Sequence, residues 1–341
     1  MLTQALEQIL QGKHLDTAVA EEAMGEIMDG KATPAQIGAF LASLRLKGEQ
    51  VEEILGFAKA MRARATTFPI ELPGLVDTCG TGGDGSHTFN ISTASAFVAA
   101  SDGVRIAKHG NRAVSSKSGS ADVLEALDVP VNLTPKNAAD CLRATNLCFL
   151  FAPLYHQAMK HAAGPRKELA VRTVFNLLGP LTNPANASHQ LMGVYDAKLL
   201  PTIASVLAQL DVKRALVVAG EDGLDELTVT GISHVAELRD GKITTYEIQP
   251  EQFGLRRYEK DALRGGDATE NAAIIHEVFA GKRGAPRDIV LLNAGAILYL
   301  ADRVSSIEAG VIRAAELIDD GLVMNKLEQV RQIAGGMIHA S

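Results

Sequence analysis

Apolar residues recur every three or four positions through the first 65 residues, which is the spacing of amphipathic helices. Four successive stripes lie at residues 2–10, 20–28, 37–44 and 51–61. Asp16 or Thr17 can cap the second helix, and Gly30 can end it. The third stripe follows residues 33–36, Thr-Pro-Ala-Gln, a capping box with proline at the first helical position. Four short helices predict a small helical domain over residues 1–68.

The pattern changes after Pro69 and Pro73, where short apolar runs begin to alternate with helical stretches. Candidate strands lie at residues 75–78, 104–107, 130–132, 148–151, 191–194, 215–219, 235–238 and 243–247. Predicted helices lie at residues 118–127, 135–145, 201–210, 288–302, 305–319 and 324–334. This alternation predicts an α/β domain over residues 69–341, with a mostly parallel sheet flanked by helices. A further helix, predicted over residues 165–178 and ended by Gly179-Pro180, can return to the N-terminal bundle.

Composition narrows the classes of function. The chain of 341 residues is 47% hydrophobic and 4% aromatic, with a net charge of −7. This acidic balance disfavours nucleic-acid binding, which needs a basic face and stacking side chains. Three cysteines are too few for a disulfide framework, and no signal peptide or membrane-spanning run is evident. We therefore expect a cytoplasmic protein with neither a membrane nor a nucleic acid as its partner.

Glycine is concentrated directly after the first predicted strand. Four glycines follow it: Gly80, Gly82, Gly83 and Gly85. Because these residues lack side chains, the backbone N–H groups of this glycine loop can surround an anion. Ser92 or Thr93 is expected to cap the next helix, which would direct the positive end of that helix at the loop. Together these features predict a phosphate-binding site.

Other interpretations of the glycine loop stay open. Gly80, Gly82 and Gly85 also fit G-x-G-x-x-G, the pattern of a dinucleotide-binding fold. However, the predicted helix begins several residues after the last glycine, and Lys108 stands near the position where a ribose-binding acid is expected. No Walker A lysine follows the glycines. A tight turn without a ligand is the remaining alternative.

A second polar segment follows the strand at residues 104–107. It runs Lys108-His109-Gly110-Asn111-Arg112-Ala113-Val114-Ser115-Ser116, and a helix then opens near Ser120. Ligands of open α/β sheets gather at the carboxyl edge of the strands, where both polar segments would meet. Lysine suits phosphate, although such cations are often only solvated, and His109 is a base or a structural imidazole.

Asp225 and Glu226 follow the apolar strand at residues 215–219. Paired carboxylates at the carboxyl edge of a sheet are plausible ligands of Mg²⁺, which prefers oxygen donors and substrate phosphates. Alone, such a pair would be an exposed acidic turn. Beside a site for an anion the metal interpretation gains weight, because carboxylates would otherwise repel the ligand.

Four motifs resemble the anthranilate phosphoribosyltransferase family of tryptophan biosynthesis. They are Asp77-Thr78-Cys79-Gly80-Thr81-Gly82-Gly83-Asp84, Asn90-Ile91-Ser92-Thr93, Lys108-His109-Gly110-Asn111-Arg112 and Phe175-Asn176-Leu177-Leu178-Gly179-Pro180-Leu181-Thr182-Asn183-Pro184. The resemblance covers essentially the whole chain, with one departure at Gln157, where the family commonly has proline. It implies a helical domain hinged to an α/β domain, a homodimer, and an active site between the domains.

The resemblance also implies roles for individual residues. Phosphoribosyl pyrophosphate, the donor, would contact Gly80, Gly83, Asp84, Thr88, Asn90, Ile91, Ser92, Thr93, Lys108, His109, Gly110, Asn111, Arg112, Ala113, Val114, Ser115, Ser116 and Ser120. Mg²⁺ would bind Ser92, Asp225 and Glu226, and anthranilate would meet Gly80, Asn111 and, through its carboxylate, Arg166. Lys108, Asp225 and Glu226 would support catalysis. Two alternatives of the same architecture are a pyrimidine nucleoside phosphorylase and a non-catalytic nucleic-acid-binding relative.

Overall fold

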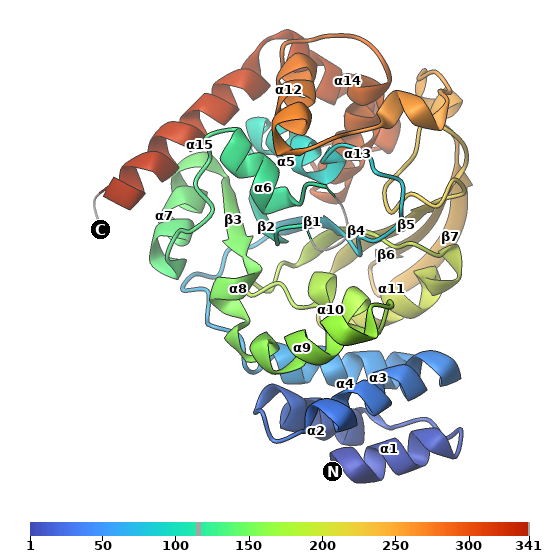
Figure 1. Ribbon diagram of the computed structural model, residues 1–341. Coiled ribbons are helices and arrows are strands. Elements are labelled where there is room, and N and C mark those ends of the chain that lie inside the picture. Colours follow the sequence, from blue (N-terminus) through green and yellow to red (C-terminus); the bar gives the residue numbers. More distant parts are fainter. Residues whose placement is uncertain (114–116, 340–341) are drawn as a thin grey trace.

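The computed structural model describes residues 1–113 and 117–339 (Figure 1). The chain opens with the four predicted helices, α1 (Leu2–Leu10), α2 (Thr17–Met28), α3 (Pro34–Lys47) and α4 (Val51–Arg62). Asp16 caps α2, since its side chain accepts a hydrogen bond from the N–H of Val19. The predicted capping box between Thr33 and Gln36 is also present. Buried side chains from all four helices form one apolar cluster, which makes this segment a helical bundle.

A seven-stranded sheet forms the centre of the rest of the molecule, in the order β3-β2-β1-β4-β5-β6-β7. Its strands are β1 (Val76–Gly80), β2 (Ile106–Gly110), β3 (Leu147–Phe151), β4 (His189–Gly193), β5 (Arg214–Gly220), β6 (Ser233–Arg239) and β7 (Lys242–Ile248). The first five strands of that order are parallel, and β6 and β7 add an antiparallel hairpin. The predicted mostly parallel sheet is therefore confirmed.

Helices cover both faces of the sheet (Figure 1). They are α5 (Ile91–Ser101), α6 (Ser120–Ala126), α7 (Pro135–Thr145), α8 (Ala152–Tyr155), α9 (Lys160–Leu169), α10 (Phe175–Leu181), α11 (Leu200–Gln209), α12 (Ala268–Phe279), α13 (Ala285–Leu300), α14 (Ile307–Asp319) and α15 (Leu322–His339). Leu216 and Val218 of β5 face the cluster that contains α5 and α13, whereas Val217 and Ala219 face α11 and the bundle. Because both faces of β5 are covered, its residues 215–219 are all apolar. No helix of the described chain is long and apolar enough to cross a membrane.

The predicted strand at residues 130–132 is wrong. Val129, Val131 and Leu133 are buried and alternate with more exposed neighbours, which imitates the period of a strand. Val129 and Leu133 instead line a small apolar cavity together with Val330 and Ala334 of α15, so packing against helices produces the pattern. Sequence periodicity alone does not separate these two cases.

The predicted helix over residues 165–178 is also wrong, because the chain forms two helices there. Ala170 adopts a left-handed conformation (φ 50°) and ends α9. The side chain of Asn176 then accepts a hydrogen bond from the N–H of Thr173, 3.0 Å away, before α10 begins. Both helices lie between the sheet and the bundle, where α9 contacts α3 and α10 contacts α4 (Figure 1). The break leaves residues 170–174 as a connector between them.

Candidate active site at the carboxyl edge of the sheet

The glycine loop leaves the carboxyl end of β1 and leads into α5. Gly82, Gly83 and Gly85 have φ values of 67°, 69° and 75°, a region that favours glycine. The predicted caps Ser92 and Thr93 are wrong, because α5 begins at Ile91 and Asn90 is the residue before it. Ser92 therefore lies in the first turn of α5. The loop and this helix end place backbone N–H groups at the edge where the sequence predicts an anion.

Two further glycines make room for the acidic segment. Gly80 and Gly193 are partners in the register of β1 and β4. A Cβ atom on Gly80 would lie 2.2 Å from Oδ2 of Asp225, and one on Gly193 would lie 1.5 Å from its carbonyl oxygen. Side chains at either position would displace Asp225. Sequence reasoning missed Gly193, although a glycine ending a strand is a signal of close backbone approach.

Asp225 and Glu226 are buried side by side, at 9% and 7% exposure. Oδ2 of Asp225 accepts a hydrogen bond from the N–H of Gly82, 2.7 Å away, which joins the acidic segment to the glycine loop. Burial raises the pKa of Asp225, and the charge of Asp84 raises it further. Burial and the charge of Asp225 likewise raise the pKa of Glu226. The site therefore holds excess negative charge, which a bound cation would relieve.

Lys108 lies beside this pair with its ammonium group directed into the protein. The side chain is 4% exposed, and Nζ donates to the carbonyl oxygen of Thr78, 2.5 Å away, and to Oγ of Ser92, 3.1 Å away. Its charge lowers the pKa of Glu226, as does a hydrogen bond from Ser92. Lys108 is thus positioned beneath the N-terminus of α5 and close to the acids.

The donor set fits a small hard cation. Ser92, Asp225 and Glu226 offer one hydroxyl and two carboxylates, all oxygen ligands of the kind that Mg²⁺ takes. Within residues 1–113 and 117–339, no cluster of three or more His, Cys, Asp and Glu side chains forms a metal cage. A cation held by two carboxylates would keep positions for water and substrate oxygens, which is typical of Mg²⁺ sites.

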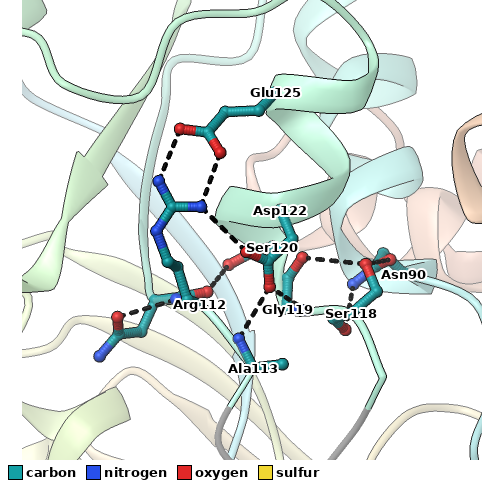
Figure 2. A network of polar contacts seen from close by, with 9 residues as sticks. Asn90, Arg112, Ala113, Ser118, Gly119, Ser120, Asp122 and Glu125 are labelled. Carbon is teal, nitrogen blue, oxygen red and sulfur yellow. Dashed lines mark hydrogen bonds and ion pairs between the residues drawn. The ribbon is translucent and has the colours of Figure 1, made fainter. Parts of the chain in front are cut away.

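The second polar segment is held by α6 (Figure 2). Oδ2 of Asp122 accepts hydrogen bonds from the N–H groups of Ala113 and Gly119, 2.9 and 2.8 Å away. The Arg112 guanidinium binds Asp122 and both carboxylate oxygens of Glu125, so this predicted donor-binding cation is engaged within the protein. Oγ of Ser120 donates to the carbonyl oxygen of Asn111, 3.3 Å away. Predicted residues Val114, Ser115 and Ser116 lie outside the described residues.

Asn90 connects the glycine loop to two other segments. Its Nδ2 donates to the carbonyl oxygen of Ser118, and its Oδ1 accepts from Nδ2 of Asn271 on α12, 3.0 Å away. Asn271 is buried, and its own Oδ1 accepts from the N–H of Gly266. Sequence reasoning missed Asn271. A single asparagine among apolar positions of a helix is the signal that could have identified it, because buried amides need partners.

The remaining residues predicted to bind the donor differ in whether their side chains or only their backbone groups can reach a ligand. Oδ1 of Asp84 accepts from the N–H of Ser86 within the loop, and Thr88 forms an isolated bridge to Arg264. Ile91 and Thr93 are buried, and Thr93 lines the same small apolar cavity as Lys108, so for these two residues only the backbone can reach a ligand.

His109 and Arg166 lie nearer the bundle side. Burial and the neighbouring His156 lower the pKa of His109 to about 3, so its imidazole is neutral at physiological pH. A methyl group on Gly110 would lie 2.3 Å from Oγ of Ser120, which explains glycine there. The Arg166 guanidinium on α9 lies 4.9 Å from the centre of the Phe175 ring, and burial lowers its pKa.

Comparison with known proteins agrees with this architecture. Residues 3–65 match the model of the glycosyl transferase family, helical bundle domain, and residues 72–324 match its a/b domain. The anthranilate phosphoribosyltransferase of Brevibacillus brevis is 89% identical over 341 residues, covering 100% of both chains. That of Acetivibrio thermocellus is 51% identical, covering 99% of this chain and 98% of the relative.

Solved structures give the same result. Anthranilate phosphoribosyltransferase (TrpD) from Thermus thermophilus aligns with a TM-score of 0.92 at 41% identity, covering 97% of this chain and 99% of the other. The Saccharomyces cerevisiae enzyme in complex with PRPP and Mg aligns at 0.90 and 28% identity, and its complex with 4-fluoroanthranilate at 0.89 and 28%, each covering 98% of both chains. The predicted fold class and family are confirmed, and the chain belongs to the anthranilate phosphoribosyltransferase family.

Proposed function

We propose that the carboxyl edge of this sheet transfers the phosphoribosyl group of 5-phosphoribosyl 1-pyrophosphate to the amine of anthranilate. The products are N-(5-phosphoribosyl)anthranilate and pyrophosphate, in tryptophan biosynthesis. The observation that carries this proposal is the junction of a glycine loop with two buried acids, through the N–H of Gly82 and Oδ2 of Asp225. This junction offers N–H groups for phosphate oxygens beside carboxylates for a cation.

The donor is assigned mainly to backbone groups. The N–H groups of the glycine loop and of the first turn of α5 bind its phosphate oxygens, with further contacts from the segment that begins at Lys108. The full set comprises Gly80, Gly83, Asp84, Thr88, residues 90–93, residues 108–116 and Ser120. Because the Arg112 guanidinium is bound to Glu125, we assign its contribution to the backbone.

Ser92, Asp225 and Glu226 hold Mg²⁺ in this proposal, and the support is their oxygen donor set and the raised pKa values of the two acids. The yeast relative was solved with PRPP and Mg. When bound, the ion supplies positive charge to the leaving pyrophosphate. Lys108 opposes the rise in the pKa of Glu226 and donates a hydrogen bond to Ser92, so it favours the ionised carboxylate that the ion would need.

Anthranilate is assigned to Gly80, Asn111 and Arg166, with the guanidinium of Arg166 binding the carboxylate bidentately. Its amine is unprotonated at neutral pH, so attack on C1 of the ribose needs no strong base. The neutral imidazole of His109 agrees with this mechanism. Catalysis then depends on alignment of the two substrates and on electrostatic stabilisation of the leaving group.

The assembly belongs to the proposal as well. We divide the chain at residues 1–68 and 69–341 and assign α9 and α10 to the bundle, because their apolar side chains share its cluster. Leu10, Leu46 and Val171 are exposed at 68%, 90% and 52%, and we infer that they lie in a homodimer interface. Sedimentation should give a dimer that Leu46→Glu weakens.

The three buried, free cysteines fit a reducing compartment, and we place the protein in the cytoplasm.

The direct experiment is pyrophosphate release from protein, Mg²⁺, phosphoribosyl pyrophosphate and anthranilate, with each component omitted in turn. We expect release only in the complete mixture. Arg166→Ala should raise the KM for anthranilate more than that for the donor, and equal changes would contradict its assignment. Phosphate-dependent cleavage of thymidine without anthranilate activity would instead identify a nucleoside phosphorylase.

A further inference from the structure

The connector between α9 and α10 brings an arginine against the glycine loop. A methyl group placed on Gly83 would lie 3.5 Å from Nε and 4.0 Å from Nη2 of Arg172, which is ordinary van der Waals contact. The guanidinium also lies over Tyr195, with Cζ 4.5 Å from the centre of the ring. Arg172 reaches this position only because the chain breaks at Ala170, where a continuous helix was predicted.

The charge of Arg172 acts on the same site. It lowers the pKa of Asp225, which opposes the effect of burial, and it lowers the pKa of Tyr195. Arg112 is held by two carboxylates and Lys108 by Thr78 and Ser92, whereas Arg172 rests on an aromatic ring. Stacking occupies the face of a guanidinium and leaves its in-plane N–H groups available for oxygen acceptors.

The space beside Arg172 is polar and large enough for water and phosphate oxygens. Arg45, Glu49, Thr173 and Tyr195 line it with Arg172, around a cavity of about 220 Å³. Arg45 of α3 donates to the carbonyl oxygen of Arg172, so the bundle holds the backbone of the connector in place. The bundle therefore holds the backbone of Arg172, and Tyr195, which follows β4, supports its guanidinium beside Gly83.

We propose that Arg172 is a further donor-binding residue, whose guanidinium binds an oxygen of the donor's pyrophosphate group at the glycine loop. The inference rests on the proposed function, because the glycine loop is the assigned site of that group. Arginine suits this role, since its planar fork matches phosphate oxygens and stays charged. It also gives the bundle a direct contribution to donor affinity.

The test compares Arg172→Ala and Arg172→Lys with the wild type and with Arg283→Ala, which removes an arginine that is exposed. We expect Arg172→Ala to raise the KM for phosphoribosyl pyrophosphate about 10- to 100-fold, with a change in the KM for anthranilate of less than about twofold. The donor KM of Arg172→Lys should lie between that of the wild type and that of Arg172→Ala. Tyr195→Leu, which removes the aromatic support, should raise the donor KM about threefold.

Three outcomes would overturn the inference: an unchanged donor KM, equal changes in both KM values, or a change confined to the Mg²⁺ concentration needed for half-maximal rate. The last would make Arg172 a counter-charge of Asp225. If Arg172→Ala does not fold, Tyr195→Leu decides, and an unchanged donor KM contradicts the proposal. Calorimetric binding of pyrophosphate with Mg²⁺ separates the two hypotheses, since an inactive wild type that still binds pyrophosphate through Arg172 would contradict only the proposed function.

Discussion

Charged side chains are balanced by partners at the amino edge of the sheet but repel one another at its carboxyl edge. At the amino edge, Arg214 pairs with Asp302 and lies 5.2 Å from the centre of the Tyr299 ring. The Tyr299 hydroxyl joins Arg239 to Glu237 through hydrogen bonds of 2.9 and 2.8 Å. Arg214 and Arg239 thus each pair with a carboxylate, Asp302 and Asp240, and Glu237 accepts the Tyr299 hydroxyl, which suits a structural role.

At the carboxyl edge, by contrast, Asp225 and Glu226 are buried beside each other and near Asp84, and burial together with like charge raises the pKa of both. The positive charge of Lys108 lowers the pKa of Glu226 and offsets only part of this repulsion. A fold that keeps such repulsion in place is less stable than it could be, and perturbed acids of this kind cluster at functional sites. The charges at the amino edge therefore stabilise the fold, whereas the unbalanced acids at the carboxyl edge are expected to bind a ligand.

The largest effect is expected from Asp225→Asn with Glu226→Gln. Both amides keep the shape of the side chains but remove the negative charge that we propose holds Mg²⁺, so Mg²⁺-dependent turnover should fall by at least about 100-fold. The thermal midpoint should stay the same or rise, because a buried repulsion is removed. Unchanged turnover across Mg²⁺ concentrations would contradict the metal assignment.

Gly193→Ala should have the next largest effect. Its Cβ atom would overlap the carbonyl oxygen of Asp225, so the acidic segment must move, and we expect turnover to fall about tenfold or more. The matched control is Gly241→Ala at the amino edge, where φ is 73° and no atom lies within 4 Å of the added methyl. That change should cost about 1 kcal/mol of stability and leave turnover alone. Similar turnover in both variants would refute the packing argument.

Stability should depend on pH through Glu226. A carboxyl whose pKa is raised by folding binds its proton more tightly in the folded state, so stability falls as the pH rises from its ordinary pKa of 4.5 toward the raised value. In the proposed site Mg²⁺ would bind the ionised form, and it should raise the thermal midpoint more at about pH 8 than at about pH 6. The double amide variant should lose both dependences, and a persistent Mg²⁺ effect in it would place the ion elsewhere.

The smallest effect is expected at the amino edge. Arg214→Met removes the pair with Asp302 and the contact with Tyr299, and we expect a loss of about 1 to 2 kcal/mol in the free energy of unfolding. The estimate is low because the Asp302 side chain is 65% exposed. Denaturant unfolding measures the loss, and both KM values should stay as in the wild type. A changed donor KM would mean that the two edges are coupled.

Local signals predicted most of the fold. The capping box at Thr33 and the glycine loop after β1 each depend only on a few neighbouring residues, so the sequence predicted both. The glycines that end β1 and β4 signal a close approach, but the approach of Asp225 to Gly80 and Gly193 depends on how distant segments pack, so the sequence did not identify it. The break at Ala170 was missed because alanine carries no sign of a left-handed conformation.

The predicted site shows the same limit. The motifs located the polar segments, yet the direction of each side chain depends on neighbours from other elements. Arg112 binds Glu125 of α6, and Lys108 turns under α5 toward Thr78. A cap at Ser92 or Thr93 was expected from residue type, but Asn90 takes that position and uses its amide to bind Ser118 and Asn271.

The most direct test is a crystal structure of the protein with phosphoribosyl pyrophosphate and Mn²⁺ in place of Mg²⁺, because Mn²⁺ can be located by its anomalous signal. The account predicts a peak bounded by Asp225, Glu226 and Ser92, with the pyrophosphate against the glycine loop. A donor bound elsewhere, or a peak away from the two acids, would contradict it.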